Sequence, residues 1–167
     1  MTMKRLDMES GRTFSYAADI SVLEEYYEKQ YELIKAGNTD LATLELVMLG
    51  NALDFIHLAD TSFGIKLDGS ENSVAVFDEV LDALNRGILQ KNLFSEKNDD
   101  IANKAAAYLG FLVIANIGGE WEDTENGTAV SVNGRTAYVG EFVAKRLMSG
   151  SELNAVSYYQ SIKLVKQ

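Results

Sequence analysis

The sequence contains neither cysteine nor proline in its 167 residues. The absence of cysteine excludes disulfide bonds, thiolate nucleophiles and cysteine metal ligands. Because proline is absent too, glycine, asparagine, aspartate and serine must mark the boundaries of helices and strands. No apolar run approaches the ~20 residues of a membrane span, and the first nine residues lack the apolar core of a secretory signal. We therefore expect a cytoplasmic protein without a membrane partner.

Basic residues are also few. The chain has 15 lysines and arginines against 25 aspartates and glutamates, which gives a formal net charge of −10. Such a chain repels nucleic-acid phosphates and anionic lipid surfaces, so neither is an expected partner. It attracts basic proteins and accelerates their encounter, although acidity more commonly serves solubility alone. The common glycine-rich nucleotide motifs and the GxSxG elbow are absent, and no cofactor is predicted.

The clearest structural pattern lies between residues 101 and 138. A helix with apolar residues on all faces is predicted over 101–117, ending at Gly118-Gly119. Two Asn-Gly pairs follow, at 126–127 and 133–134, and Asn-Gly is the strongest short-range hairpin signal. The pattern predicts antiparallel strands near 119–124, 128–132 and 135–139. Gly110, within the helix, predicts a close packing contact.

The rest of the chain reads as further helices. Ser21 begins a capping box and predicts a helix to about 36, and others are expected over 39–58, from 73, over 141–148 and over 151–164. A short strand is predicted over 63–67. The fold class is therefore α+β: a mainly helical single domain over 21–167, with a small three-stranded meander at about 119–139 packed on the central apolar helix. Residues 1–20 are expected to form an N-terminal arm or short strand.

Two segments carry a resemblance to a known pattern. One is Leu67-Asp68-Gly69-Ser70-Glu71-Asn72-Ser73, and the other is Ala107-Tyr108-Leu109-Gly110 followed by Gly118-Gly119-Glu120-Trp121. The chain resembles an uncharacterised bacterial protein family with an LDxSxxS turn before a helix and a glycine-marked helix followed by Gly-Gly-x-Trp. In that family a glutamate often follows the helix glycine, whereas this sequence has Phe111. The family has no established function, so the resemblance implies none.

The only histidine, His57, defines the candidate catalytic site. Asp54 and Asp60 lie three residues on either side of it, and on a helix this spacing brings the three side chains roughly together. Such a group suits a His–Asp acid/base pair or a metal. A dimetal carboxylate bundle needs two such motifs, and the sequence offers one, so no metal is predicted. More commonly, this pattern of residues is only a partly buried histidine near a helix end with solvated aspartates beside it.

The candidate binding residues fall into two groups. Trp121 is either an interface anchor or a core residue that holds the meander on the central helix, and the second interpretation is favoured. Acidic residues surround it, and a second acidic group occupies one face of the first helix. The candidate binding residues are Trp121, Glu120, Glu122 and Asp123 in the first group and Glu25, Glu28 and Glu32 in the second.

These observations favour a non-catalytic acidic protein-binding module. The expected partner is a protein with a basic surface. The role considered is inhibition of that partner, as by an immunity-type or anti-defence protein. One alternative is a small enzyme that uses His57 with Asp54 or Asp60. The other is a structural, oligomerising protein with a large apolar face around its aromatic helices. The sequence predicts no oligomeric state.

Overall fold

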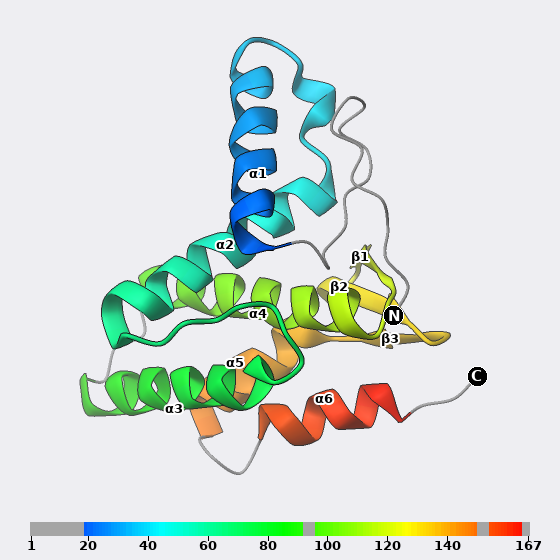
Figure 1. The fold of residues 1–167 in the computed structure, drawn as a ribbon. Helices are drawn as coiled ribbons and strands as arrows, with labels where there is room; N and C mark the ends of the chain where they lie inside the picture. Colours follow the sequence, from blue (N-terminus) through cyan, green and yellow to red (C-terminus); the bar gives the residue numbers. More distant parts are fainter. Residues whose placement is uncertain (1–18, 92–95, 150–153, 165–167) are drawn as a thin grey trace.

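The computed structural model describes residues 19–91, 96–149 and 154–164 (Figure 1). Over these residues the chain is mainly helical with one small antiparallel sheet, which confirms the predicted α+β fold class. The elements in chain order are α1 (Ile20–Lys35), η1 (Thr39–Leu41), α2 (Leu44–Phe63), α3 (Ser73–Lys91), α4 (Glu96–Asn116), β1 (Glu120–Thr124), β2 (Gly127–Val132), β3 (Arg135–Ala137), α5 (Val139–Ser149) and α6 (Ala155–Lys163). The predicted N-terminal arm lies outside the described residues, except for its last two positions.

Helix α4 forms the centre of the fold. Every residue from 105 to 115 is buried, because apolar side chains on all sides of the helix require cover on all sides. Helix α2 provides the most extensive cover, and α5 and β2 pack against α4 as well. Helix α1 and the beginning of α2 extend away from this body as a projection (Figure 1). None of the helices in the described ranges has the length and apolar character needed to span a membrane.

The three strands form a meander in the order β1-β2-β3, as predicted. Trp121 lies opposite Val130, and Val130 lies opposite Ala137. These three side chains are buried, because alternate residues of each strand point to the core. Glu122 and Ser131 belong to the other set and are less buried. The face that carries Trp121, Val130 and Ala137 therefore covers one end of the core, and Ala129 on the opposite face is buried as well.

The second turn has the predicted geometry, whereas the first is displaced by one residue. Asn133 and Gly134 have φ values of 52° and 73°, as a type I′ turn requires. In the first hairpin Thr124 pairs with Gly127, so the loop consists of Glu125 and Asn126. The Thr124 hydroxyl accepts a hydrogen bond from the Asn126 N–H at 3.1 Å and donates one to the Gly127 carbonyl at 2.7 Å. These side-chain hydrogen bonds stabilise a loop at residues 125–126, one residue before the predicted turn at Asn126-Gly127.

The predicted strand over 63–67 is wrong. Phe63 is the last residue of α2, and Gly64 caps the helix with a φ of 65°. The residues that follow form no regular secondary structure and pair with no strand in the described residues. The alternation that suggested a strand instead reflects the burial of Leu67 between exposed neighbours.

Several helix boundaries also differ from those predicted. Helix α1 begins at Ile20, after Asp19 rather than a Ser21 cap. Residues 39–41 form a separate 3-10 turn, and α2 begins after Thr43, whose hydroxyl accepts from the Leu46 N–H. Helix α4 begins at Glu96, five residues before the predicted start, and α5 spans Val139–Ser149. The predicted cap of the last helix, Ser151, lies outside the described residues, and Asn154 caps α6.

The turn before α3 is held on α4 by Tyr108. Its hydroxyl accepts from the Gly69 N–H at 3.0 Å and lies 2.9 Å from the Ser73 hydroxyl. Burial raises the pKa of Tyr108 to about 12, so the phenol stays protonated at neutral pH. Asn116 donates to the Gly69 carbonyl at 3.1 Å. The LDxSxxS segment therefore stabilises the packing of α3 on α4.

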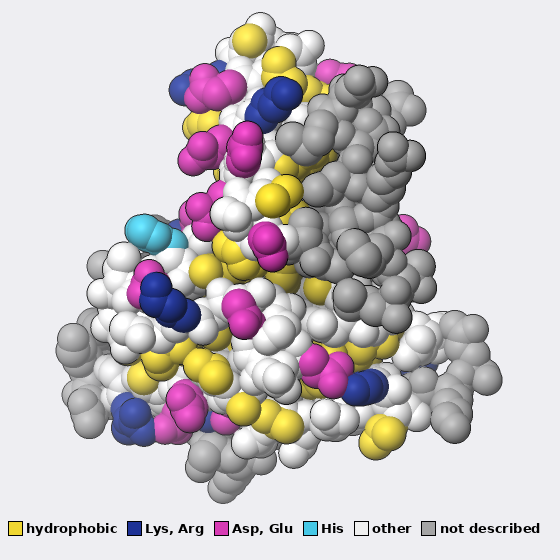
Figure 2. All heavy atoms as spheres, viewed as in Figure 1, with side chains coloured by type: hydrophobic (Ala, Val, Ile, Leu, Met, Phe, Trp, Pro, Cys, Tyr) yellow, Lys and Arg dark blue, Asp and Glu magenta, His cyan; other side chains and the backbone are white. Residues whose placement is uncertain are grey.

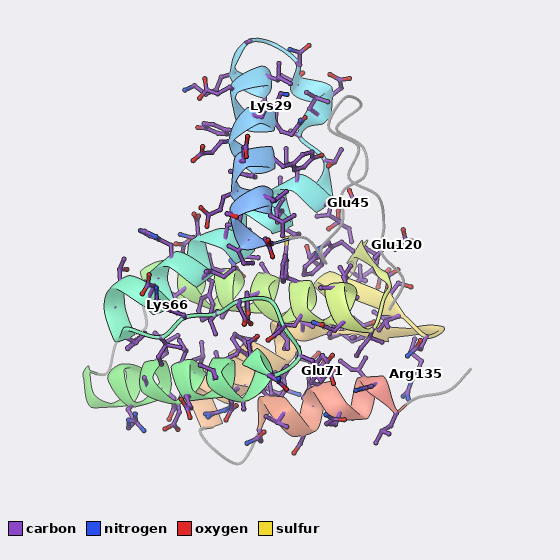
Figure 3. All side chains as sticks on the ribbon, in the orientation of Figure 1. Lys29, Glu45, Lys66, Glu71, Glu120 and Arg135 are labelled. Carbon is purple, nitrogen blue, oxygen red and sulfur yellow. The ribbon has the colours of Figure 1, made fainter. Side chains whose placement is uncertain are left out.

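Glu71, in the same turn, connects it to α6 (Figure 3). Its carboxylate accepts from the Lys163 ammonium at 2.6 Å and from the Tyr159 hydroxyl at 2.7 Å. Both bonds favour the ionised form and hold the pKa of Glu71 below its usual value. A lowered carboxyl pKa stabilises the fold above the usual glutamate pKa of about 4.3, and this contribution is lost as the pH falls through the folded-state pKa.

Glu71→Gln should therefore lower the Tm at pH 7 and have less effect at low pH, once the pH has fallen through the folded-state pKa of Glu71 and the wild-type carboxyl has also become neutral. Thermal unfolding of both proteins across this range measures the difference. Glu79→Gln, at an exposed position of α3, is the matched control and should change the Tm little at either pH. A Tm difference between Glu71→Gln and wild type that stays constant through the pH range in which the Glu71 carboxyl takes up its proton would show that the charge of Glu71 does not connect the turn to α6.

Candidate functional site

The candidate catalytic group lies on the outer surface of α2. Asp54, His57 and Asp60 are all exposed, and Figure 2 shows the single histidine at the surface. Asp54 contacts Lys104 of α4 at 3.7 Å. Within the described ranges, no three histidine, aspartate or glutamate side chains lie close enough to hold a metal ion together. The helix therefore brings the three residues to one solvated face rather than into an enclosed site.

Trp121 belongs to the core. Its side chain is 5% exposed, and its six-membered ring lies against the backbone of α4 at Gly110. This is the packing role favoured by the sequence, and it also explains the glycine within α4. The indole Nε1 has no hydrogen-bond partner among the residues that the structure describes. The ring is not accessible as the anchor of an interface.

The acidic residues around Trp121 lie on different faces of the sheet. Glu120 and Glu122 point away from the core, whereas Asp123 follows the alternation of Trp121. Glu122 accepts a hydrogen bond from the Thr136 hydroxyl at 2.8 Å, and Asp123 accepts one from Thr128 at 3.2 Å. Two of the three carboxylates therefore stabilise neighbouring strands.

The acidic stripe of α1, defined by Glu25, Glu28 and Glu32, is exposed to solvent. All three side chains are exposed, and acidic residues gather over the projection in Figure 2. Glu32 lies 3.7 Å from Lys35, itself exposed, while Glu25 and Glu28 form no ion pair with a described residue. The stripe therefore keeps most of its charge available to an approaching molecule.

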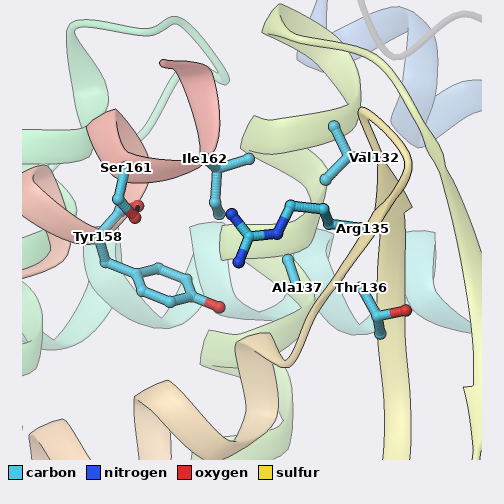
Figure 4. A pocket seen from close by; sticks show the side chains of 7 residues that line it. All are labelled: Val132, Arg135, Thr136, Ala137, Tyr158, Ser161 and Ile162. Atoms are coloured by element: carbon cyan, nitrogen blue, oxygen red, sulfur yellow. Dashed lines mark hydrogen bonds between the residues drawn. The ribbon is translucent and has the colours of Figure 1, made fainter. Parts of the chain in front are cut away.

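A feature that the sequence did not reveal lies beside the sheet, between β3 and α6. A cavity of about 280 Å³ is lined by Val132, Arg135, Thr136, Ala137, Tyr158, Ser161 and Ile162 (Figure 4). A second cavity, of about 380 Å³, shares Thr136 and Tyr158 with it and continues to Tyr138, Glu141, Phe142 and Lys145. We call the two together the β3 groove.

The β3 groove contains two hydrogen-bond donors without partners in the described structure, the Arg135 guanidinium and the Tyr158 hydroxyl. The Tyr158 ring stacks on Phe142 with centroids 4.2 Å apart. Burial, with a smaller effect of Glu141, raises the pKa of Tyr158 to about 12, so the hydroxyl remains a donor at neutral pH. The Tyr158-Tyr159 pair was the only signal of this site in the sequence: Tyr159 is buried, while Tyr158 borders the groove.

A third cavity, of about 580 Å³, lies over α3 and includes Arg86 and Arg146 among its lining residues. Both arginines are engaged: Arg86 pairs with Asp82, and the buried Arg146 pairs with Asp78 through Nε at 3.1 Å. These contacts neutralise the positive charges of both arginines. Its arginines therefore serve the packing of α3 and α5.

The comparisons with known proteins give no match: no family model, curated protein or solved structure corresponds to this chain. The functional argument consequently depends on the geometry of the surfaces described above.

Proposed function

We propose that this protein is a non-catalytic protein-binding module that recognises a basic protein through the acidic stripe of α1. The particular role we propose is inhibition of that partner, as in immunity-type or anti-defence proteins. The observation that carries the proposal is the position of the stripe. Glu25, Glu28 and Glu32 are exposed on a helix that projects from the body of the fold (Figure 1).

The projection suits recognition for two physical reasons. The opposite side of α1 is anchored by Leu23 and Tyr26, both fully buried, so the helix presents its carboxylates from a fixed position. A partner can also approach the projection without contacting the α4 core. Exposed charges on such an element steer a basic partner and accelerate association, and this effect is screened over ~8 Å at physiological salt.

The test is charge reversal at the stripe. The partner in this test is a basic protein captured from cell extract by the immobilised wild-type protein. The triple variant Glu25→Lys, Glu28→Lys, Glu32→Lys should lower the association rate with that protein by about tenfold or more at low salt, because steering fields change rates by 10 to 10³. The control variant Asp60→Lys, Glu79→Lys, Glu125→Lys changes the net charge equally at exposed positions off α1. Stopped-flow association at low and high salt compares the two variants with wild type.

The control should associate much faster than the stripe variant at low salt, and high salt should bring the two rates together. Equal slowing of both variants would mean that net charge alone acts, without recognition by α1. Circular dichroism and the Tm establish that each variant is folded. If the wild-type rate does not depend on salt, the acidity serves solubility and the proposal fails.

A further inference from the structure

We propose that the β3 groove binds the free C-terminal end of a polypeptide, with the terminal carboxylate held by Arg135 and the Tyr158 hydroxyl. This site is separate from the acidic stripe of α1 and does not depend on the function proposed for it. Four observations support the assignment: an unpaired cation, a second donor on a half-buried tyrosine, the charges at the rim and the shape of the cavity.

The cation is unusual in this protein. Acidic residues outnumber basic ones by 25 to 15, and the other two arginines that the structure describes, Arg86 and Arg146, both contact carboxylates. Arg135 forms no hydrogen bond or ion pair with a described residue. Its guanidinium extends into the space between β3 and α6 (Figure 4). A guanidinium presents a planar pair of donors that matches the two oxygens of a carboxylate.

The other polar groups of the cavity define what the ligand must be. The Ser161 hydroxyl donates to the Tyr158 carbonyl at 2.6 Å, and the Thr136 hydroxyl donates to Glu122 at 2.8 Å. The donors left for a ligand are therefore Arg135 and the Tyr158 hydroxyl. Both require an acceptor, and a carboxylate is acceptor-only. Both donors are accessible to a ligand, since Arg135 is exposed and Tyr158 is half-buried, and hydrogen bonds to a charged acceptor are the stronger ones.

The charges at the rim favour a carboxylate over a phosphate. Glu122 contacts Thr136 on one side, and Glu141 lines the second cavity on the other. Lys145 is paired with Glu141 at 2.8 Å, which leaves Arg135 as the cation available to the ligand. A phosphate with up to two negative charges would meet stronger repulsion from these carboxylates than a singly charged terminus. Arg135 alone compensates one negative charge.

The shape of the groove indicates the end of a chain. Val132, Ala137 and Ile162 form an apolar wall beside Arg135, where the last side chain of a peptide would be buried. The second cavity continues past Tyr158 to Tyr138 and Phe142, whose aromatic surfaces would contact the preceding residues. A volume of about 280 Å³ accommodates one aliphatic side chain and its terminal carboxylate. The ligand class is thus a polypeptide that ends in an apolar residue.

The test uses three small probes and NMR titration of the full-length protein. The probes are N-acetyl-leucine, its uncharged amide, and an acetylated tetrapeptide of three alanines and a free C-terminal leucine. N-acetyl-leucine should shift resonances of β3 and α6, and the amide should bind at least about tenfold more weakly, because hydrogen bonds to a charged group are the strong ones. The tetrapeptide should bind more tightly than N-acetyl-leucine.

Three variants assign the binding to the groove. Arg135→Gln should weaken N-acetyl-leucine binding by about tenfold or more. Tyr158→Phe should weaken it by several-fold, because it removes only the hydroxyl donor and keeps the ring stacked on Phe142. Arg86→Gln removes an exposed arginine elsewhere and should leave binding unchanged. The α1 stripe variant should also bind the probe normally, which separates this proposal from the preceding one.

Each contrary result overturns a stated part of the proposal. Equal binding of the acid and the amide, or none of the acid at millimolar concentration, excludes a carboxylate site. Tighter binding of phenyl phosphate than of N-acetyl-leucine would show that the groove selects phosphate. A tetrapeptide no tighter than N-acetyl-leucine would exclude a polypeptide ligand.

Discussion

Arg146→Ala is expected to lower the free energy of unfolding by about 3–5 kcal/mol, because it leaves the carboxylate of Asp78 without its cation. Arg146 is 1% exposed, and its guanidinium donates to both carboxylate oxygens of Asp78, at 3.1 and 3.3 Å. Asp78 also accepts from the Ala155 N–H at 2.8 Å, at the start of α6. Arg146 also lies 3.5 Å from the Asp82 carboxylate, so its ion pairs with α3, together with the bond from Asp78 to α6, hold α3, α5 and α6 together. Urea denaturation measures their loss.

Two further variants determine whether burial causes this effect. Arg86→Ala removes an arginine whose side chain is 61% exposed and should cost about 0.5 kcal/mol or less. The double variant Asp78→Leu, Arg146→Met replaces both charges with apolar groups and should be less destabilised than the sum of the two single changes. A cost for Arg146→Ala no greater than that for Arg86→Ala would contradict a structural role for the ion pair.

Gly110→Ala should lower the free energy of unfolding by roughly 1–3 kcal/mol through overpacking. A Cβ at this position would overlap Cη2 of Trp121 and lie 2.6 Å from Cζ2. The indole is 5% exposed, so the ring has little room to move. This net cost requires the free-energy cost of overpacking to exceed the gain from the higher helix propensity of alanine, which by itself favours the substitution by about 1 kcal/mol. Gly110→Leu should destabilise at least as much.

Gly87 supplies a matched control for this change. It lies within α3, and a Cβ there would meet no atom within 4 Å, so Gly87→Ala should be stabilising by up to about 1 kcal/mol. Trp121→Leu removes the six-membered ring, so Gly110→Ala should cost less in that background than in wild type. An equal cost in both backgrounds would exclude the contact between Gly110 and Trp121 as the cause.

The elements that could be predicted from sequence are those specified by local residues. Continuous apolar character over 105–115 can be satisfied only by a helix buried on all sides, and Asn133-Gly134 supplies the positive φ values of a type I′ turn. The prediction of a strand over 63–67 was wrong because alternation of apolar and polar residues indicates a strand only where another strand can pair with it. The described sheet provides none beside it. The first hairpin loop moved because the Thr124 hydroxyl closes it, a contact that the Asn-Gly rule omits.

The functional surfaces were predicted less completely, since they depend on residues far apart in sequence. Arg135 and Tyr158 line one cavity from β3 and α6, and nothing near either residue in the sequence indicates the other. Trp121 was easier to predict, because the glycine in α4 and the meander that follows it indicate the packing of the ring on that helix. The stripe of α1 could be predicted, since the helical period alone places its three glutamates on one face.

Photo-cross-linking from α1 in living cells tests the central claim most directly. Tyr31 is 48% exposed and lies on α1 near Glu28 and Glu32, so benzoylphenylalanine replaces it conservatively. Phe63, 37% exposed at the end of α2, provides the matched control position. Recognition by α1 predicts a discrete adduct with a basic protein from position 31, absent at position 63 and lost in the stripe variant. The same adducts from both positions, or an adduct at 31 that survives charge reversal of the stripe, would contradict it.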